Sequence, residues 1–276
     1  MILGTWNLQV YPPRYSARGI RLAQEFSNHP ADVWFLTELH ADWQAEEQNV
    51  HFSQPRVSSR PTQRLSAIAT SWSMEPIPST DDPADSWVCL AHLTDTAASR
   101  SVLAVSSVLP WRSLAPEERY FRGREMTYAE AFQHVLDHTV RRITEERRPD
   151  EDVVWGGDFN QSLSGRDYVG TARGRAELLE AAETFGLRAL TSDAPSMNPD
   201  HPAIDHIFVP SSWIVQGRLA IYRPTQDGKP LSDHALYIVE ASPPIDKESF
   251  TDVAFGRSFS ISECASRLAT SRVESL

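Results

Sequence analysis

The sequence predicts an α/β fold in which β-sheets are covered by helices. Two observations support this fold class. Short apolar runs of strand length recur along the chain, and amphipathic segments of helical length lie between them. With 276 residues, of which 41% are hydrophobic, the chain can bury the core that such a fold requires. We therefore expect one large domain.

The first part of the chain predicts a strand over residues 2–8, a helix over residues 16–28 and a short buried strand over residues 33–37. Three further runs have the length and the β-branched content that are typical of strands: residues 65–71, 87–93 and 102–108. The middle of the chain is therefore expected to be mostly sheet.

The second half predicts two helices and the remaining strands. One helix is expected over residues 128–147, because apolar residues recur there at helical intervals and Pro149 follows. The other is expected over residues 176–184, where Gly186 suits the left-handed position after the last turn. Strands are expected over residues 153–155, 204–209 and 236–239. The sequence contains no internal repeat and no low-complexity run.

Charge and cysteine content exclude several classes of protein. The net charge of -11 argues against a protein that coats nucleic acid through a broad basic surface. The two cysteines, Cys89 and Cys264, match no metal or redox spacing, so we expect buried thiols and a reducing compartment. The sequence has no secretion signal and no run of roughly 18 apolar residues. It therefore predicts a soluble, cytoplasmic protein without membrane contact.

The composition changes after Pro243 and Pro244, where Ser, Glu, Asp and Arg become frequent. We expect a catalytic domain over residues 1–243 and a polar C-terminal appendage over residues 244–276. The alternative is that three phenylalanines of this segment pack back onto the domain: Phe250, Phe255 and Phe259.

Polar side chains follow several of the predicted strands. Asn7 and Glu38 each stand at the carboxyl end of a short apolar strand, which is where α/β proteins assemble ligand sites from separate connections. Taken alone, an asparagine here could end a strand and a glutamate could be a solvated charge. Their shared position favours a common site.

The segment Gly156-Gly157-Asp158-Phe159-Asn160 is more specific. Paired glycines after a buried strand let the backbone turn tightly and approach a ligand closely, and an Asp and an Asn two residues apart share one face. A structural turn built on these two side chains is the alternative.

Two segments near the end of the chain place an acid beside a histidine. They are Asp205-His206 and Asp233-His234. In either segment the histidine could instead be a hydrogen-bonded structural residue.

The ordered set of Asn7, Glu38, GGDFN, Asp205-His206 and Ser232-Asp233-His234 resembles the endonuclease/exonuclease/phosphatase superfamily over about residues 1–240. The resemblance implies a four-layered α/β sandwich, in which two mixed sheets pack face to face with helices outside. It also implies a hydrolase that cleaves phosphate esters with a divalent cation. By this resemblance Asn7, Glu38 and Asp233 are ligands or close partners of that cation, Mg²⁺ or alternatively Mn²⁺.

The same resemblance implies roles for four further residues. Asp158 would orient or deprotonate the attacking water, and Asn160 would donate a hydrogen bond to a phosphoryl oxygen. His234 would face the scissile phosphate, with Asp205 fixing its tautomer and favouring its protonated form. A cation and an imidazolium together meet the need for positive charge where the transition state accumulates negative charge.

The sequence departs from the superfamily pattern at the end of the strand over residues 102–108. Family members usually carry a His or a Tyr there that contacts the phosphate, and this chain has neither. Ser107, Arg112 or the loop over residues 119–124 could replace that contact.

Two groups of loop residues are candidates for substrate contact, because arginine forks bind phosphates and aromatic rings stack on bases. Each could equally be a solvated loop residue with ordinary ion pairs. The first group is Ser107, Trp111, Arg112, Tyr120, Arg122 and Arg124, and the second is Arg166, Tyr168, Arg173 and Arg175.

These residues favour a nuclease that acts on DNA or RNA. One alternative is a phosphatase or phosphodiesterase for a small or lipid-derived phosphate. Another is a catalytically inactive binding module of the same fold. The sequence makes no prediction of the oligomeric state.

Overall fold

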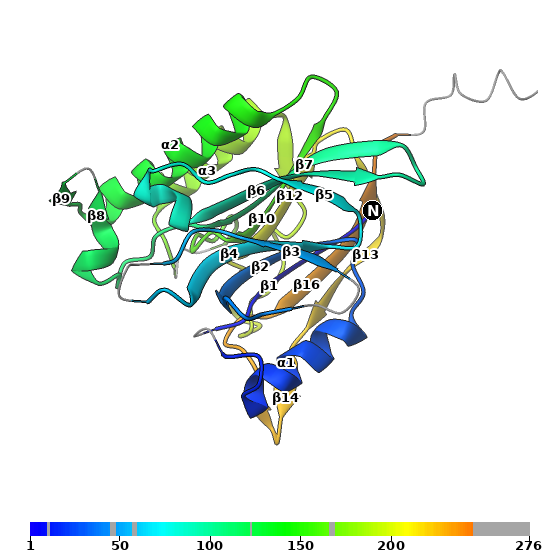
Figure 1. Cartoon of the computed structure of the whole chain (residues 1–276), viewed down its shortest axis with the longest axis horizontal. Coiled ribbons are helices and arrows are strands. Elements are labelled where there is room, and N and C mark those ends of the chain that lie inside the picture. The colour runs from blue at the N-terminus through cyan, green and yellow to red at the C-terminus, as the bar shows by residue number, and fades with distance from the viewer. Residues whose placement is uncertain (10–11, 45–47, 57–59, 122, 166–168, 245–276) are drawn as a thin grey trace, which may run out of the picture. The chain divides into compact units, whose positions relative to one another are not determined.

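A computed structural model describes residues 1–9, 12–44, 48–56, 60–121, 123–165 and 169–244. Met1–Ser242 form one compact unit. Its centre consists of two six-stranded mixed sheets (Figure 1).

The first sheet has the strand order β13-β16-β1-β2-β4-β3. Only β1 and β2 are parallel, and the other neighbours in this sheet are antiparallel. The strands are β1 (Ile2–Asn7), β2 (Val33–His40), β3 (Asn49–Phe52), β4 (Gln63–Thr70), β13 (Ile214–Tyr222) and β16 (Leu236–Ser242).

The second sheet has the strand order β11-β12-β10-β7-β6-β5, with β7 and β10 as its parallel pair. Its strands are β5 (Ser73–Pro76), β6 (Val88–Asp95), β7 (Arg100–Val108), β10 (Asp152–Asp158), β11 (Leu187–Ala189) and β12 (Asp205–Pro210). Two small hairpins stand apart from the sheets: β8 (Tyr120–Phe121) with β9 (Arg124–Glu125), and β14 (Thr225–Gln226) with β15 (Lys229–Pro230).

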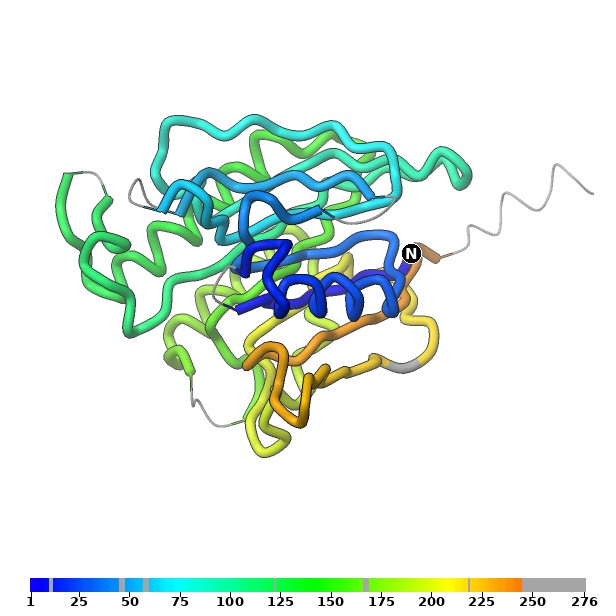
Figure 2. The backbone as a smooth tube through the Cα atoms, turned by 60° about the horizontal axis from the view of Figure 1, so that its bottom comes forward, coloured from blue at the N-terminus to red at the C-terminus, as the bar shows by residue number. Residues whose placement is uncertain are grey.

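Helices cover the outer faces of the two sheets. Helix α1 (Ala17–Asn28) lies on the first sheet, and in Figure 2 its blue coil runs in front of the strands that it covers. Helices α2 (Tyr128–Glu146) and α3 (Ala172–Thr184) cover the second sheet (Figure 1). Two short 3-10 helices, η1 (Pro83–Ser86) and η2 (Pro116–Arg119), complete the elements. The four-layered α/β sandwich that the resemblance implied is confirmed.

Strand β2 shows why the sheets pack in this way. Its side chains alternate between the two faces of the sheet, as in any strand. Val33 and Phe35 enter the core between the sheets, whereas Trp34 and Leu36 enter the core under α1. Because both faces are buried, the strand is apolar at consecutive positions, which is the pattern expected for a strand inside a layered fold.

The two glycines before Asp158 serve packing inside a strand, so the expected tight turn at this place is wrong. Both belong to β10, opposite the first sheet and beside β7. A Cβ on Gly156 would lie 2.2 Å from the Phe35 ring, and a Cβ on Gly157 would lie 2.0 Å from the Ser107 carbonyl oxygen. Gly157 also has a φ of +133°, a backbone conformation that residues other than glycine rarely adopt.

Several elements differ from the sequence-based expectation. The nine-residue strand β13 was not predicted, because Gly217 and a register shift between Gln216 and Ala220 interrupt its apolar pattern. The sequence analysis expected no strand between residues 209 and 236, and β13 shows that this expectation is wrong. Helix α3 begins at Ala172, four residues before the expected start at Ala176, because Thr171 caps it by accepting a hydrogen bond from Gly174 N.

Two further expectations concern the cysteines and the C-terminal appendage. Cys89 is a free, buried cysteine, and burial raises the pKa of its thiol. Cys264 and nearly all of the expected appendage lie outside the described residues.

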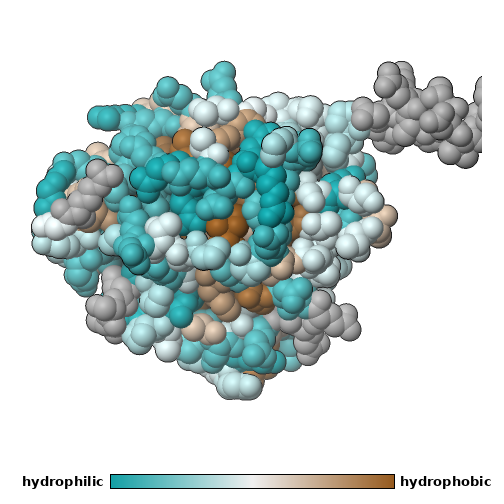
Figure 3. Space-filling model, turned by 45° about the horizontal axis from the view of Figure 1, so that its top comes forward, coloured by the Kyte–Doolittle hydropathy of each residue, from teal (hydrophilic) through white to brown (hydrophobic). Residues whose placement is uncertain are grey.

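On the face shown in Figure 3, hydrophilic residues predominate and apolar ones are exposed in small patches. Among the described residues, no helix has the length and apolar character needed to cross a membrane.

Candidate active site

The sheet topology brings the polar strand ends together at one edge of the sandwich. Because β1 and β2 are parallel, Asn7 lies beside Thr37, one residue before Glu38. Strand β16 runs antiparallel to β1, so the residues that precede β16 lie at the same edge. In the second sheet β12 runs antiparallel to β10, which places Asp205 directly opposite Asp158.

Asp158, Asp205 and His234 form the centre of the site. One side-chain ligand atom from each of the three lies within 4.8 Å of the others. His234 donates from Nδ1 to Asp205 Oδ2 at 2.7 Å, and its Nε2 lies 3.9 Å from Asp158 Oδ2. The imidazole therefore stands between the two carboxylates, with Asp205 on one nitrogen and Asp158 near the other.

The proximity of these groups shifts their protonation. Burial, together with the charge of Asp205, raises the pKa of Asp158 to about 7. Burial alone would lower the pKa of His234, but the charges of Asp205 and Asp158 outweigh it and raise that pKa well above its usual value. The cluster thus combines a carboxyl group that can take up a proton near neutral pH with an imidazole that favours its protonated form.

Two asparagines fix the carboxylate of Asp158. Asn7 donates from Nδ2 to Asp158 Oδ2 at 3.0 Å, and the backbone N–H of Asn160 donates to Asp158 Oδ1 at 2.9 Å. The side-chain amide of Asn160 donates to the carbonyl oxygen of Leu109 at 3.0 Å. Its predicted contact with a phosphoryl oxygen therefore remains a prediction.

Glu38 and Asp233 lie at the same edge as this cluster. The charge of Glu38 helps to raise the pKa of Asp158, and Asp233 Oδ1 is 3.7 Å from His234 Nε2. Glu38 has a φ of +56°, an uncommon conformation for a residue with a side chain.

The donor atoms at this edge fit a hard divalent cation. They are carboxylate and amide oxygens, which Mg²⁺ and Mn²⁺ prefer. Asp205 Oδ1 is buried without a hydrogen-bond partner among the described residues, so a polar group of the cluster is left without compensation. The described group whose ligand atoms lie close enough together to hold an ion is Asp158, Asp205 and His234, and the carboxylates of Glu38 and Asp233 add negative charge at the same edge.

Ser232 joins the last motif to the first. Its Oγ donates to the carbonyl oxygen of Asn7 at 2.6 Å and accepts from the N–H of His234 at 3.1 Å. Sequence analysis assigned Ser232 no role, although its place beside Asp233 and His234 was a signal. Gln9 was missed as well, and its Oε1 accepts from the N–H of Asp233 at 3.2 Å.

His206, the neighbour of Asp205, is directed away from the cluster. Its Nε2 donates to the carbonyl oxygen of Gln161 at 2.8 Å, and its Nδ1 lies 3.0 Å from Thr191 Oγ1. Burial lowers the pKa of this fully buried imidazole to about 4, so it is neutral at neutral pH. The structure therefore places His206 in the core of the second sheet.

Ser107 does not face the site. It is completely buried, and its hydroxyl accepts a hydrogen bond from Trp155 Nε1 at 2.8 Å. Its predicted contact with substrate is wrong, because strand alternation turns this side chain into the core under α2 and α3. Trp111 is half-buried. Its ring centroid lies 6.0 Å from that of Trp87 and 5.4 Å from the Arg56 guanidinium.

The other candidate substrate contacts engage partners within the protein. Arg112 Nη2 donates to the carbonyl oxygen of Gly170 at 2.5 Å, and Arg124 pairs with Glu130 at 2.8 Å. Tyr120 is 56% exposed.

The second group behaves similarly. Arg173 pairs with Glu177 at 2.6 Å, and Arg175 Nε donates to the carbonyl oxygen of Ser162 at 2.8 Å. Three of the predicted residues lie outside the described residues: Arg122, Arg166 and Tyr168.

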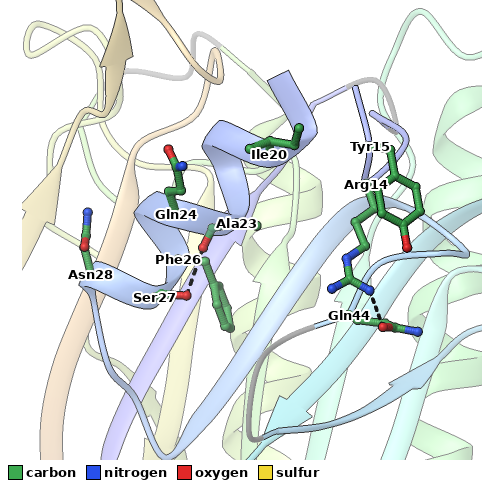
Figure 4. A pocket seen from close by; sticks show the side chains of 9 residues that line it. All are labelled: Arg14, Tyr15, Ile20, Ala23, Gln24, Phe26, Ser27, Asn28 and Gln44. Atoms are coloured by element: carbon green, nitrogen blue, oxygen red, sulfur yellow. Dashed lines mark hydrogen bonds between the residues drawn. The ribbon is translucent and has the colours of Figure 1, made fainter. Parts of the chain in front are cut away.

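A cavity of about 550 Å³ adjoins the cluster, because Asp205, Asp233 and His234 form part of its wall. The rest of the wall is Val169, Ser196, Met197, Asn198, His201, Ile204 and Pro230. A separate cavity of about 480 Å³ lies along α1 (Figure 4), where its lining includes Arg14, Tyr15 and Gln44 but none of the site residues. The first cavity is therefore the one next to the chemistry.

Comparison with protein families finds a match to the Endonuclease/Exonuclease/phosphatase family over residues 4–234, a range that contains every residue of the cluster. Among curated proteins, none matches this chain in sequence.

Solved structures resemble the chain over most of its length. The endonuclease domain of TRAS1, a telomere-specific non-LTR retrotransposon, has a TM-score of 0.58 and 17% identity, over 88% of this chain and 97% of that chain. The 3′ phosphatase NExo from Neisseria, bound to a product DNA hairpin, has a TM-score of 0.60 and 16% identity, over 88% and 99%. A mannosyl-6-phosphatase from Bacteroides thetaiotaomicron has the same four values. At these identities the likeness shows the fold.

Proposed function

The chain belongs to the endonuclease/exonuclease/phosphatase family and is a phosphoester hydrolase, and from this premise we propose that it cleaves phosphodiester bonds of DNA or RNA. The observation that carries the proposal is the cluster of Asp158, Asp205 and His234 beside an open cavity. These groups supply a proton acceptor and a proton-bearing imidazole within reach of one phosphate. We further propose a cytoplasmic location and a domain boundary near residue 243, on the composition of the chain.

We propose that the enzyme uses Mg²⁺, with Mn²⁺ as a substitute, and that Asn7, Glu38 and Asp233 hold the cation. When bound, the cation supplies positive charge that stabilises the negative charge developing on the phosphoryl oxygens. The clustered carboxylates support this proposal, because their mutual repulsion is relieved by a cation.

Asp158 is the group that orients the attacking water and takes up its proton. Two hydrogen bonds, from Asn7 and from the backbone of Asn160, hold its carboxylate in one orientation. The raised pKa of Asp158 matches this role, since a general base is most effective when its pKa lies near the working pH.

His234 faces the scissile phosphate through Nε2. Asp205 holds the opposite nitrogen at 2.7 Å and keeps the imidazole protonated, so that it can donate a hydrogen bond to a phosphoryl oxygen or protonate the leaving group.

The wall of the adjoining cavity supports a nucleic acid substrate. Val169, Met197, Ile204 and Pro230 give this cavity an apolar wall next to His234. Such a wall suits the base or sugar beside a scissile phosphate. Because the net charge of -11 repels a polyanion, local cations must carry the attraction.

A phosphatase for a small phosphate ester is the second candidate. One observation favours it: two of the arginines that were predicted to contact substrate already have partners in the protein. Arg112 donates to Gly170 and Arg124 pairs with Glu130, so a long phosphate backbone would have to compete for them.

An activity screen separates the two candidates. The protein is assayed with Mg²⁺ and with Mn²⁺ against single-stranded DNA, duplex DNA, abasic duplex, RNA and a chromogenic phosphodiester, with small phosphomonoesters in parallel. We expect cleavage of at least one nucleic acid. Turnover of phosphomonoesters alone would replace the nuclease proposal by the second candidate.

The metal proposal predicts loss of activity in EDTA and weakened cation binding in Glu38→Ala, because one oxygen ligand is removed. Titration calorimetry with Mn²⁺ on the wild type and the variant measures this. Glu183→Ala, at an exposed position of α3, is the matched control and should bind as the wild type does. Full activity in chelator, or unchanged binding in Glu38→Ala, would remove Glu38 from the site.

A further inference from the structure

Arg18 lies in the first turn of α1, where a positive charge opposes the helix dipole. Its side chain leaves the helix and donates hydrogen bonds to three backbone carbonyl groups. Nη1 donates to Gln9 O at 2.7 Å and Nη2 to Leu8 O at 2.9 Å. Nε and Nη2 both donate to Leu231 O, at 2.9 and 2.6 Å.

These carbonyl groups belong to the segments that carry two of the three candidate metal ligands, Asn7 and Asp233. Leu8 and Gln9 directly follow Asn7, and Leu231 directly precedes Ser232, Asp233 and His234. The two segments are far apart in the chain, since Asn7 and Ser232 are separated by 225 positions. A single planar group therefore bridges both sides of the site.

Hydrogen bonds from Arg18 support an uncommon backbone conformation at Gln9 in the bridged segment. Gln9 has a φ of +50°, which costs free energy for a residue with a side chain. Its carbonyl oxygen and its Oε1 both accept from Arg18, and the same Oε1 accepts from the N–H of Asp233. The conformation of Gln9 is thus connected on one side to Arg18 and on the other to Asp233.

The charge of Arg18 lies beside the same ligands. Burial lowers the pKa of its guanidinium, while the charges of Asp233 and Glu38 raise it. An arginine remains protonated at neutral pH. The group thus adds a permanent positive charge next to two carboxylates that the proposed function assigns to a cation.

We propose that Arg18 is a positioning residue of the metal site: its guanidinium holds the segment after Asn7 against the segment before Asp233 and so sets the spacing of the ligands. The inference rests on the proposed function, because it concerns the cation that this function requires. Arg18 contacts neither the cluster nor, by this inference, the cation.

A comparison of arginine with lysine at this position separates spacing from charge. The guanidinium is a planar fork whose three nitrogens reach carbonyl groups on two segments at once. A lysine keeps the charge but presents a single nitrogen, which cannot reproduce this bridge. If spacing matters, Arg18→Lys behaves like Arg18→Ala.

The test is a calorimetric titration with Mn²⁺, without substrate, of the wild type and of both Arg18 variants. We expect the dissociation constant to rise about 10- to 100-fold in both, which is the usual effect of losing a group that orients metal ligands. Arg21→Ala is the matched control, because Arg21 lies on the same helix and contacts other residues of that helix. Its guanidinium pairs with Glu25 at 2.7 Å and donates to Gln24 Oε1 at 3.2 Å. Arg21→Ala should bind Mn²⁺ as the wild type does.

Addition of N-ethylguanidinium to Arg18→Ala should restore much of the Mn²⁺ affinity, because it refills the bridge, and should leave Arg21→Ala unchanged. Wild-type affinity in Arg18→Lys would overturn the inference, since a single nitrogen that cannot bridge the two segments would then suffice. If Arg18→Ala does not fold, Gln9→Ala takes its place: removing Oε1 breaks the link between Arg18 and Asp233 and should weaken Mn²⁺ binding, and unchanged binding would count against the inference.

The Mn²⁺ affinities are measured without substrate, so they do not depend on which substrate the enzyme cleaves. Failure of the activity screen with a weakened Mn²⁺ affinity in Arg18→Lys would overturn the nuclease proposal and leave this inference standing. Cleavage of nucleic acid with an unchanged affinity in Arg18→Lys would do the reverse.

Discussion

His206 and His234 show how the same side chain acquires two roles from its surroundings. His206 is completely buried, with its nitrogens next to a carbonyl group and a hydroxyl group, and its pKa is lowered to about 4. His234 stands among three carboxylates, and its pKa is raised well above the usual value, although burial opposes this. Burial therefore favours the neutral form of His206, and the neighbouring carboxylates favour the protonated form of His234.

This difference predicts the effects of removing each ring. His234→Ala should lower kcat by at least about 10²-fold, which is the low end for losing a positioned acid-base group. The midpoint of thermal unfolding should stay close to that of the wild type. His206→Ala should instead destabilise the fold by about 1–3 kcal/mol, because buried hydrogen-bonding groups lose their partner. Steady-state kinetics and thermal melts check both variants, and a folded His206→Ala as inactive as His234→Ala would contradict the assignment.

The contact between Asp205 and His234 predicts a change in the pH dependence of activity. The negative charge of Asp205 raises the pKa of His234, so Asp205→Asn should lower that pKa. The imidazole then loses its proton at a lower pH. Activity should therefore fall more at alkaline than at acidic pH. The profile of kcat against pH measures this, and an unchanged alkaline limb would show that the charge of Asp205 does not set the protonation of His234.

At the scale of the element, the seven residues of β10 combine a packing role with the carboxylate that we propose as the general base. Its two glycines admit the Phe35 ring from the facing sheet and the backbone of β7, and the strand then ends at Asp158. Because the sheets approach closely just before Asp158, the position of this carboxylate depends on the packing of the layers.

The packing of β10 predicts that Gly156→Ala destabilises the protein. The added Cβ would lie 2.2 Å from the Phe35 ring, which is itself completely buried and has little room to move. Such overpacking typically costs about 1–3 kcal/mol of the free energy of unfolding. Gly186→Asn is the control: Gly186 has a φ of +64° with nothing within 4 Å of an added Cβ, and asparagine tolerates that conformation. Chemical denaturation of the two variants compares them, and equal stability would refute the packing role.

At the scale of the whole molecule, every residue of the candidate site belongs to the compact unit Met1–Ser242. The family match likewise ends at residue 234, before the tail begins.

A chain that ends at Ser242 should therefore fold and keep the activity of the full-length protein. Circular dichroism and the substrate screen on the two proteins test this. Insoluble protein, or a truncated chain that has lost turnover, would show that the tail completes the core or the substrate groove.

The sequence by itself determined the fold class and the strands that carry the candidate site residues. Apolar runs marked those strands, and polar residues at or near their ends, Asn7, Glu38 and Asp158, marked one edge of the sheets. These features are local, because strand length, alternation and the residue after a strand can be read within a few positions.

Only the tertiary structure decided which side chains face that edge and what holds them there. Ser107 was predicted as a substrate contact but points into the core. The bond from Ser232 to Asn7 and those from Arg18 to Leu231 join positions separated by 225 and 213 residues. Such contacts leave no periodic signal in the sequence, because they depend on how distant segments meet after the layers have packed.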